Sequence, residues 1–293
     1  MTKSSQQHFG LSSANLKWIA LVFMTIDHLG AFGYEIELFS EYNYPLRVLG
    51  RIAAPLFLFV IIHSAKYTRN KLAFLLRLYL AGIGTGLFTA ITNFALGESV
   101  GYLHGYNMLF TFFYIVLIIY MIDGVIRAKP EERARRLAIF GGGLAIIVLF
   151  CLMGEWFYGI GSTTYYELPL RQMTFLQNIY DAVLPSLLRV DYSIIYVAMG
   201  VLMYFAPSKG AKCAVYCGFC ALCAVVTVIG SLNNAALPYM EFFNEIQCFM
   251  FLALPFMVLY SGEKGRGYAK GFFYIYYPVH SYLIYLTAYF IAK

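Results

Sequence analysis

The chain has 293 residues, of which 61% are hydrophobic and only 12% charged, and its mean hydropathy is +0.68. This composition excludes an ordinary soluble domain, in which about a quarter of the residues are charged. The net charge of +6 is explained by basic loops beside anionic lipid, so it requires no nucleic-acid partner.

Apolar runs of about 17–25 residues, each able to cross about 30 Å of hydrocarbon as a helix, recur along the chain. They predict an all-α polytopic membrane protein with one domain, residues 1–293, built as a single bundle of about 9–10 transmembrane helices. In chain order, the predicted spans are 16–33, 45–64, 71–96, 107–127, 137–153, 192–206, 211–229, 243–260 and 271–291.

One further segment, 171–191, is ambiguous because Gln177, Asn178, Asp181 and Pro185 interrupt its apolar residues. Cytoplasmic loops collect Lys and Arg, so the charge of the loops decides between the two topologies. If this segment does not span and the N-terminus is inside, the inner segments hold 16 of the 21 basic residues. We therefore favour a cytoplasmic N-terminus, an outer C-terminus, and an interfacial or re-entrant segment at 171–191.

Cysteines and glycines gather inside the apolar runs. Cys213, Cys217, Cys220 and Cys223 fall at helical spacing in one span, and glycines recur in AGIGTG (81–86) and GGG (141–143). A metal site needs converging ligands, usually with histidine or carboxylate company, and a phosphate loop needs a strand before it. We therefore expect no metal, and we expect these small residues to pack helices together.

Ionisable residues inside the spans are the strongest functional signal. Asp27 and His28 lie side by side in TIDHLG, about 7 Å below the outer end of the first span. Arg51 lies at about the same depth in the second span, and His280 lies near the middle of the last. Lipid penalises each unpaired charge by several kcal/mol, so we expect these side chains to share one cavity.

Arg47 and Arg51 are four residues apart and share one helix face, so we predict that Asp27 pairs with one of them. One cation then remains in excess and could meet an anionic ligand or a developing oxyanion. Adjacent helix residues point about 100° apart, which leaves His28 free to act as an acid or a base. The alternative is structural: the pair joins helices, and the histidine bonds a carbonyl group.

Near the C-terminus, Tyr276 and Tyr277 precede Pro278-Val279-His280, where we expect the proline to free a carbonyl group and bend the helix.

Several motifs together resemble the TraX family of bacterial membrane proteins. They are IDHLG (26–30), LRVLGRIAAPLFLF (46–59), YTRN (67–70), NMLFT (107–111), DYS (191–193), ALPFMVLYSGEKG (253–265) and FFYIYYPVH (272–280). The similarity covers most of the chain, but 128–170 contains no motif that we can match. Ser193 stands where the resemblance leads us to expect glycine.

The resemblance implies an acetyltransferase of the bacterial cytoplasmic membrane that uses cytoplasmic acetyl-CoA. The family's founding member acetylates the N-terminal amine of a pilin, and related membrane acyltransferases modify cell-surface glycans, so the acceptor could be a peptide amine or a glycan hydroxyl. A membrane-embedded histidine is catalytic in those relatives, and arginines handle the acyl donor. Carried over, this predicts catalytic roles for His28, Asp27 and His280; acetyl-CoA contacts from Arg47, Arg51, Arg69, Arg77, Lys264 and Arg266; and acceptor contacts from Asn107, Asp191, Tyr192 and Tyr277.

Within this class the histidine could act as a general base, or it could carry the acetyl group as a transient acetyl-histidine. A transporter or channel is the competing class, because buried Asp, Arg and His residues also form proton or anion paths. Against it, the sequence shows no paired hydropathy halves. A non-enzymatic assembly protein for envelope components is a third possibility.

Overall fold

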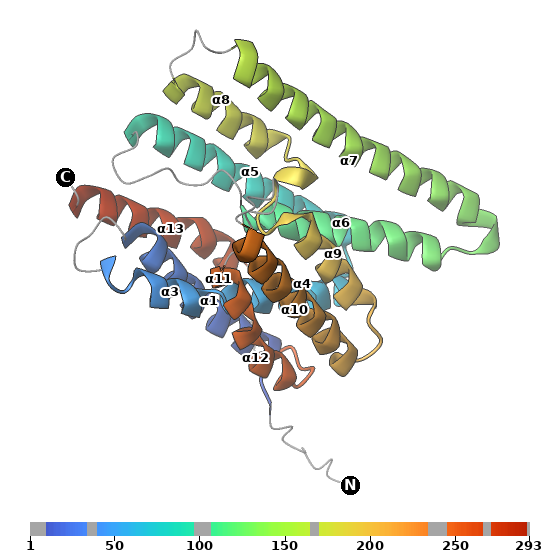
Figure 1. Cartoon of the computed structure of the whole chain (residues 1–293). Helices are drawn as coiled ribbons and strands as arrows, with labels where there is room; N and C mark the ends of the chain where they lie inside the picture. Colours follow the sequence, from blue (N-terminus) through green and yellow to red (C-terminus); the bar gives the residue numbers. More distant parts are fainter. Residues whose placement is uncertain are drawn as a thin grey trace. The chain divides into compact units, whose positions relative to one another are not determined.

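A computed structural model describes residues 10–33, 40–96, 107–164, 170–233, 245–265 and 271–291. These residues are predominantly helical and contain no β-strand, so the predicted all-α class is confirmed (Figure 1). The chain divides into two compact units. The first unit contains 1–60 and 206–291, and the second contains 61–205 with the last two residues.

Five described segments are long and apolar enough to cross a membrane, which agrees with the predicted multi-pass protein. They are Asn43–Tyr67, Lys71–Leu96, Met108–Ile126, Pro130–Gly159 and Lys209–Gly230. Two further apolar helices, Ser193–Phe205 and Ile246–Val258, are shorter. Helices α1 (Ser13–Phe32) and α13 (Phe272–Ile291) have 20 residues each, or about 30 Å, and they carry the polar motifs.

In the first unit, α1 packs against α3 (Asn43–Gly50) and α13. A turn at residues 51–52 separates α3 from α4 (Ala53–Tyr67). This break has a local cause: Pro55 has no N–H to donate to the carbonyl group of Arg51. The unit also contains α10 (Lys209–Asn233), α11 (Glu245–Cys248), the short 3₁₀ helix η4 (Phe249–Ala253) and α12 (Leu254–Val258).

The start of α1 is tied to the segment that follows α12. Residues 11–14 and 259–264 share four backbone hydrogen bonds of 2.8–3.2 Å, and Ser12 Oγ caps α1 by accepting from Asn15 N. Two glycines of SGEKG have φ of +86° (Gly262) and +72° (Gly265), a conformation that other residues adopt at a cost. These glycines shape the backbone of the motif.

In the second unit, α5 (Lys71–Leu96) packs against α6 (Met108–Ile126) and α8 (Leu170–Val183). Glycine permits both contacts. A Cβ atom at Gly82 would lie 2.6 Å from the Phe110 ring, and one at Gly86 would lie 2.6 Å from Ala182 Cβ. These two glycines of AGIGTG therefore pack helices together, as predicted.

The rest of this unit contains α7 (Pro130–Thr164), the 3₁₀ helix η3 (Leu187–Arg189) and α9 (Ser193–Phe205). Helix α8 has 14 residues, about 21 Å, so it is too short to cross the hydrocarbon. Between η3 and α9, Tyr192 and Ser193 have φ of +64° and +68°. The left-handed backbone at Ser193 gives a physical reason for the glycine that the resemblance leads us to expect there.

Candidate active site

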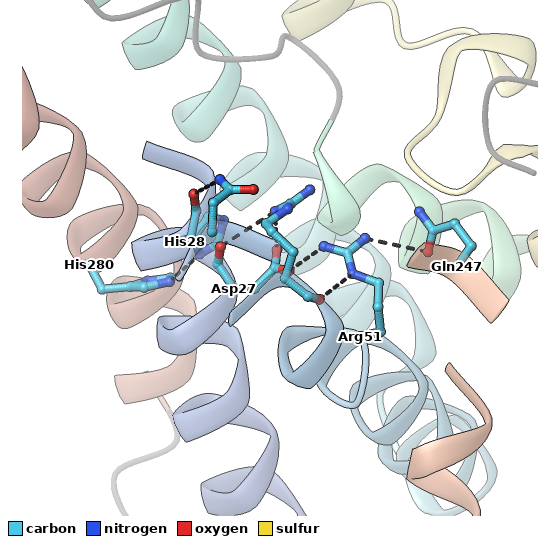
Figure 2. A network of polar contacts seen from close by, with 8 residues as sticks. Asp27, His28, Arg51, Gln247 and His280 are labelled. Atoms are coloured by element: carbon cyan, nitrogen blue, oxygen red, sulfur yellow. Dashed lines mark hydrogen bonds and ion pairs between the residues drawn. The ribbon is translucent and has the colours of Figure 1, made fainter. Parts of the chain in front are cut away.

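Neighbouring residues of α1 reach two different helices, as Figure 2 shows. Asp27 points towards α3, whereas His28 points towards His280 on α13. This divergence follows from the 100° between adjacent helix residues. The structure brings Asp27, His28, Arg47, Arg51 and His280 together within the first unit, as the depth argument predicted.

The Asp27 carboxylate binds both arginines. Its Oδ2 atom lies 2.7 Å from Arg47 Nη1, and its Oδ1 atom accepts a hydrogen bond from Arg51 Nη2. The predicted pair is thus a triad with one negative and two positive charges. The side chains of Asp27 and Arg51 are only 13% and 5% exposed, while that of Arg47 is 28% exposed, so Arg47 is the most exposed member of the triad.

Gly50 makes this triad possible, because a Cβ atom there would lie 2.3 Å from Asp27 Cβ. No real pair of Cβ atoms approaches that closely, so α1 and α3 could not pack as they do with a side chain at Gly50. Its neighbour Arg51 supplies the charge that binds Asp27. Gly50 therefore allows α1 and α3 to approach closely, and Arg51 makes the ion pair with Asp27 that this close approach permits.

Two more groups hold Arg51 in place. Its Nε atom donates to the Arg47 carbonyl group at 3.3 Å, and its Nη1 atom donates to Gln247 Oε1 at 3.4 Å (Figure 2). Sequence analysis missed Gln247. The available signal was its polarity, because it is the one amide in the apolar helix Ile246–Val258.

The two histidines form a pair whose proton positions follow from its partners. His280 Nδ1 lies 2.7 Å from the Tyr276 carbonyl oxygen, which can only accept, so His280 Nδ1 carries a hydrogen. In a neutral ring His280 Nε2 is then an acceptor. It lies 2.8 Å from His28 Nδ1, which must donate. Neutral His28 therefore keeps its lone pair on Nε2, the atom that can take a proton or attack a carbonyl carbon.

Tyr276 supports His280 from two directions. Besides its carbonyl group, its ring stacks on the His280 ring with centroids 4.8 Å apart. Its hydroxyl lies 2.9 Å from Thr25 Oγ1, and Thr25 donates to the Leu21 carbonyl group, so the tyrosine is the donor in the first contact. Tyr277, the predicted acceptor contact, is more distant, with its ring 6.4 Å from His280. Sequence analysis missed Thr25, although it begins TIDHLG.

A surface pocket of about 500 Å³ lies at the opposite end of α1. Asn15, Trp18 and Glu263 are among its lining residues, and Asn15 is about 20 Å from His28 along the helix axis. The backbone N–H groups of Ser13 and Ala14 already bond the carbonyl groups of 263 and 264. The helix N-terminus therefore offers few donors to an anion here, and the positive residues near the pocket in sequence are Lys17 and the exposed Lys264.

Most of the other predicted residues belong to the second unit. Arg69 and Arg77 are exposed residues of the second unit, and Arg266 lies outside the described residues. The predicted acceptor contacts Asn107, Asp191 and Tyr192 also belong to the second unit. Buried Asn107 caps α6 through Oδ1 and donates to the Gly82 carbonyl group at 3.2 Å, so a structural role accounts for both ends of its amide. The Asp191 carbonyl group accepts from Thr111 at 2.8 Å.

The described residues contain no group of three or more His, Cys, Asp or Glu side chains arranged to hold a metal ion.

Comparison with protein families gives one match. The model of the family described as "TraX protein" matches residues 12–166, more than half of the chain. The match includes 128–166, where we found no motif, and it ends before the C-terminal motif that supplies His280. No curated protein and no solved structure matches the chain. The chain is a multi-pass helical membrane protein that belongs to the TraX family.

Proposed function

We propose that this protein is an acetyltransferase that moves the acetyl group of acetyl-CoA to an amine or hydroxyl acceptor at the bacterial cytoplasmic membrane. The observation that carries the proposal is the chain of contacts from the Tyr276 carbonyl group through His280 to His28. It leaves a basic lone pair on His28 Nε2 beside a triad with an excess positive charge. A general base next to a cation is the arrangement that acyl transfer requires.

In the proposed reaction, the acceptor nitrogen or oxygen attacks the thioester carbonyl carbon while His28 Nε2 takes its proton. The new C–N or C–O bond forms, the C–S bond breaks, and the CoA sulfur leaves with the proton returned by His28. His280 keeps His28 in the required tautomer by accepting from its Nδ1–H group. A group placed in this way typically contributes 10²–10⁴-fold to the rate.

Arg47 is the group that we assign to the oxyanion of the tetrahedral intermediate. In the described contacts it binds Asp27 through Nη1 alone, which leaves its other donors for a ligand. It is also the more exposed of the two arginines. Arg51 is buried and bonded to Gln247 and Arg47, so its proposed role is to position Asp27.

The donor would approach from the cytoplasmic end of α1. The predicted topology places the pocket beside Asn15 and Trp18 at that end, next to the segment that carries Lys264. We propose that this end receives the nucleotide part of acetyl-CoA. The extended pantetheine arm would then run along α1 towards His28, which is about 15 Å from Trp18 and about 20 Å from Asn15 along the helix axis.

The proposal is tested with the protein in lipid nanodiscs and in cells. We expect acetyl-CoA to raise the apparent Tm of wild type and of His28→Ala alike. Radiolabelled acetyl groups should reach the membrane fraction of cells that express wild type but not of cells that express His28→Ala. His63→Ala, a histidine of the second unit, is the matched control and should retain labelling.

Sorting the label between protein and glycan fractions would identify the acceptor. Normal labelling with His28→Ala would contradict the mechanism. Absence of both stabilisation and labelling in wild type, together with proton or anion flux in liposomes, would replace the enzyme by a transporter.

A further inference from the structure

The surface pocket at the start of α1 has walls that the backbone holds in place. Its volume is about 500 Å³, within the range of small-molecule sites, and it is lined by the first turns of α1 and by residues 263 and 265. The four backbone hydrogen bonds between residues 11–14 and 259–264 join the two walls. Gly265 permits this close approach, since a Cβ atom there would lie 2.3 Å from Ser12 Oγ. The walls therefore keep their places without a ligand.

The pocket is poorly suited to a phosphate group. The first four N–H groups of a helix are the usual donors to a phosphate. In α1 all four, from Ser13 to Leu16, already donate to oxygen atoms of the protein. Glu263, which lines the pocket, also carries a negative charge that would repel an anion. The pocket therefore suits an uncharged part of a ligand.

Trp18 gives the pocket an aromatic wall. The residue is 37% exposed although two rings of α13 pack around it, with centroid distances of 5.5 Å to Phe272 and 5.7 Å to Phe273. These contacts hold the indole in place. A fixed and partly exposed ring is a platform on which a flat base can stack. A tryptophan that only anchored the protein at the membrane interface would need neither a pocket nor polar neighbours.

Two polar side chains of the pocket have opposite hydrogen-bonding character. Ser12 Oγ donates to Asn15 Oδ1, so among the described contacts the Asn15 amide keeps its Nδ2 group to donate to a ligand. The Glu263 carboxylate can only accept. The edge of adenine carries an amino group that donates and a neighbouring ring nitrogen that accepts. The donor and the acceptor of the pocket therefore match the edge of this base.

Positive charge lies next to the pocket. Lys17 Nζ is 5.4 Å from the centre of the Phe273 ring, the same ring that Trp18 contacts. Lys264 is exposed and belongs to the segment that lines the pocket. A ligand with its base on Trp18 would therefore have ammonium groups close to its phosphates.

We propose that this pocket binds the adenine base of the acetyl donor, with the base stacked on Trp18 and its polar edge bonded to Asn15 and Glu263. The choice of adenine rests on the proposed function, which makes acetyl-CoA the donor. About 15 Å of helix axis then separates Trp18 from His28 and is spanned by the diphosphate and the pantetheine arm.

Trp18 can report on its own ligand. The chain has two tryptophans, Trp18 and Trp156, so in a Trp156→Phe background the tryptophan fluorescence comes from Trp18 alone. The probes, added to the protein in nanodiscs, are CoA, ADP, UDP and phosphopantetheine, which has the arm of CoA but no base. We expect saturable quenching by CoA and ADP, weaker quenching by UDP with its smaller ring, and none by phosphopantetheine.

Removing the indole should weaken the binding of ligands that carry the base. Trp18→Leu should lower the affinity for CoA and ADP by about 5–150-fold in calorimetry, the range for the loss of one stacked base. Its affinity for phosphopantetheine should stay at the wild-type value. Trp156→Leu is the matched control, because Trp156 is an exposed tryptophan of the second unit, and it should bind every probe as wild type does.

A second comparison keeps Trp18 and tests the polar edge, so it decides even if Trp18→Leu does not fold. The diphosphate of purine riboside lacks only the amino group of ADP, and with it the hydrogen bond to Glu263. Wild type should prefer ADP by about threefold to tenfold, and Glu263→Ala should bind the two equally. Any effect of the lost charge on the shared diphosphate cancels in this ratio. Glu132→Ala, an exposed residue of α7, should keep the preference.

Several results would overturn the proposal. Quenching by phosphopantetheine as strong as that by CoA would place the arm in the pocket, and UDP affinity equal to that of ADP would remove the adenine. Equal affinity of wild type for ADP and the purine riboside compound would exclude the polar contacts.

The pocket and the proposed function can fail separately. Acetyl transfer without quenching by CoA, and with unchanged CoA affinity in Trp18→Leu, would contradict the pocket and leave the enzyme. Quenching by CoA and ADP without any acetyl transfer would support the pocket and contradict the enzyme.

Discussion

His28 and His280 are joined by a hydrogen bond of 2.8 Å between His28 Nδ1 and His280 Nε2, and the Tyr276 carbonyl oxygen, 2.7 Å from His280 Nδ1, fixes its direction. The two rings therefore have different roles, although both lie on facing helices and are shielded from water. His28 is half-buried and His280 is buried. His280 is committed at both nitrogens, while His28 keeps one nitrogen for chemistry. Variants of the two should consequently differ in how much activity they lose.

We expect His28→Gln to lower acetyl transfer by about 10²–10⁴-fold, because the general base is removed. His280→Gln should lower kcat by only about 10–100-fold, the usual effect of losing a group that orients a functional side chain. The KM for acetyl-CoA should stay near its wild-type value in both variants. Initial rates at several acetyl-CoA concentrations measure this difference.

Equal losses in the two variants would contradict the assignment of the base to His28 Nε2. Apparent Tm values of both variants should be recorded in parallel, since a folding defect would lower the two rates together.

The charge of Asp27 should matter for stability before it matters for catalysis. Asp27→Asn leaves Arg51, whose side chain is 5% exposed, without its counter-charge, and breaking a buried pair costs about 3–5 kcal/mol. Adding Arg51→Gln to this variant should restore part of the loss, because the uncompensated buried charge is then removed. Unfolding in nanodiscs, followed by circular dichroism, measures both effects.

A matched control is available on α7. Glu132 and Arg136 form an ion pair of 3.7 Å with both side chains about half exposed, and such pairs contribute about 0–1 kcal/mol. Glu132→Gln should therefore change stability little. If Asp27→Asn proved as mild as this control, the triad would not be a buried charge network.

Much of this site could be predicted from the sequence, because the physics of membranes makes buried charge conspicuous. Asp27 needed a counter-charge, and Arg47 and Arg51 shared a helix face at matching depth, so their meeting followed from the cost of isolation. His28 and His280 were grouped by depth in the same way. The family resemblance selected the same residues from independent motifs.

The other contacts of the site depend on the distances and rotations between helices. The hydrophobic periodicity of a sequence gives neither of these. Nothing in the sequence separates Tyr276 from Tyr277, since only the helix rotation decides which ring stacks on His280. Gln247 and Thr25 are common polar residues whose partners come from other segments. Asp181 was seen only as a polar interruption of an apolar segment, because its partner Tyr158 comes from another helix.

Gly50 offers a test of the helix contact itself. Gly50→Ala would place a Cβ atom 2.3 Å from Asp27 Cβ, so α1 and α3 must separate and the triad must lengthen. Overpacking of this kind usually costs about 1–3 kcal/mol, and we expect acetyl transfer to fall with it. The control is Gly84→Ala in α5, where a Cβ atom meets nothing within 4 Å and stability should rise or stay unchanged. Equal effects of the two substitutions on Tm would argue against the close approach.

Asp181 should make stability depend on pH. Burial raises its pKa from 3.8 to about 6 in the folded chain, so the folded state binds its proton more tightly than the unfolded state. Stability from this group is then fully present below about pH 4 and is lost as the pH rises through 6, by about 3 kcal/mol in total. Asp181→Asn removes this loss. The free energy of unfolding of the variant minus that of wild type should therefore increase between pH 4 and pH 7, and a constant difference would contradict it.

Ser193 is strained in a way that a single substitution should relieve. Its φ of +68° lies in the left-handed region, which costs a non-glycine residue about 1–2 kcal/mol. Ser193→Gly should accordingly raise stability by up to about 1 kcal/mol, because the added freedom of glycine in the unfolded chain offsets part of the gain. Ser64→Gly, inside α4, is the control and should lower stability by about 0.5 kcal/mol, since glycine is a poorer helix former than serine. Opposite shifts in apparent Tm would confirm the strained turn before α9, whereas a loss of stability in both variants would mean that the hydroxyl of Ser193 matters more than its backbone.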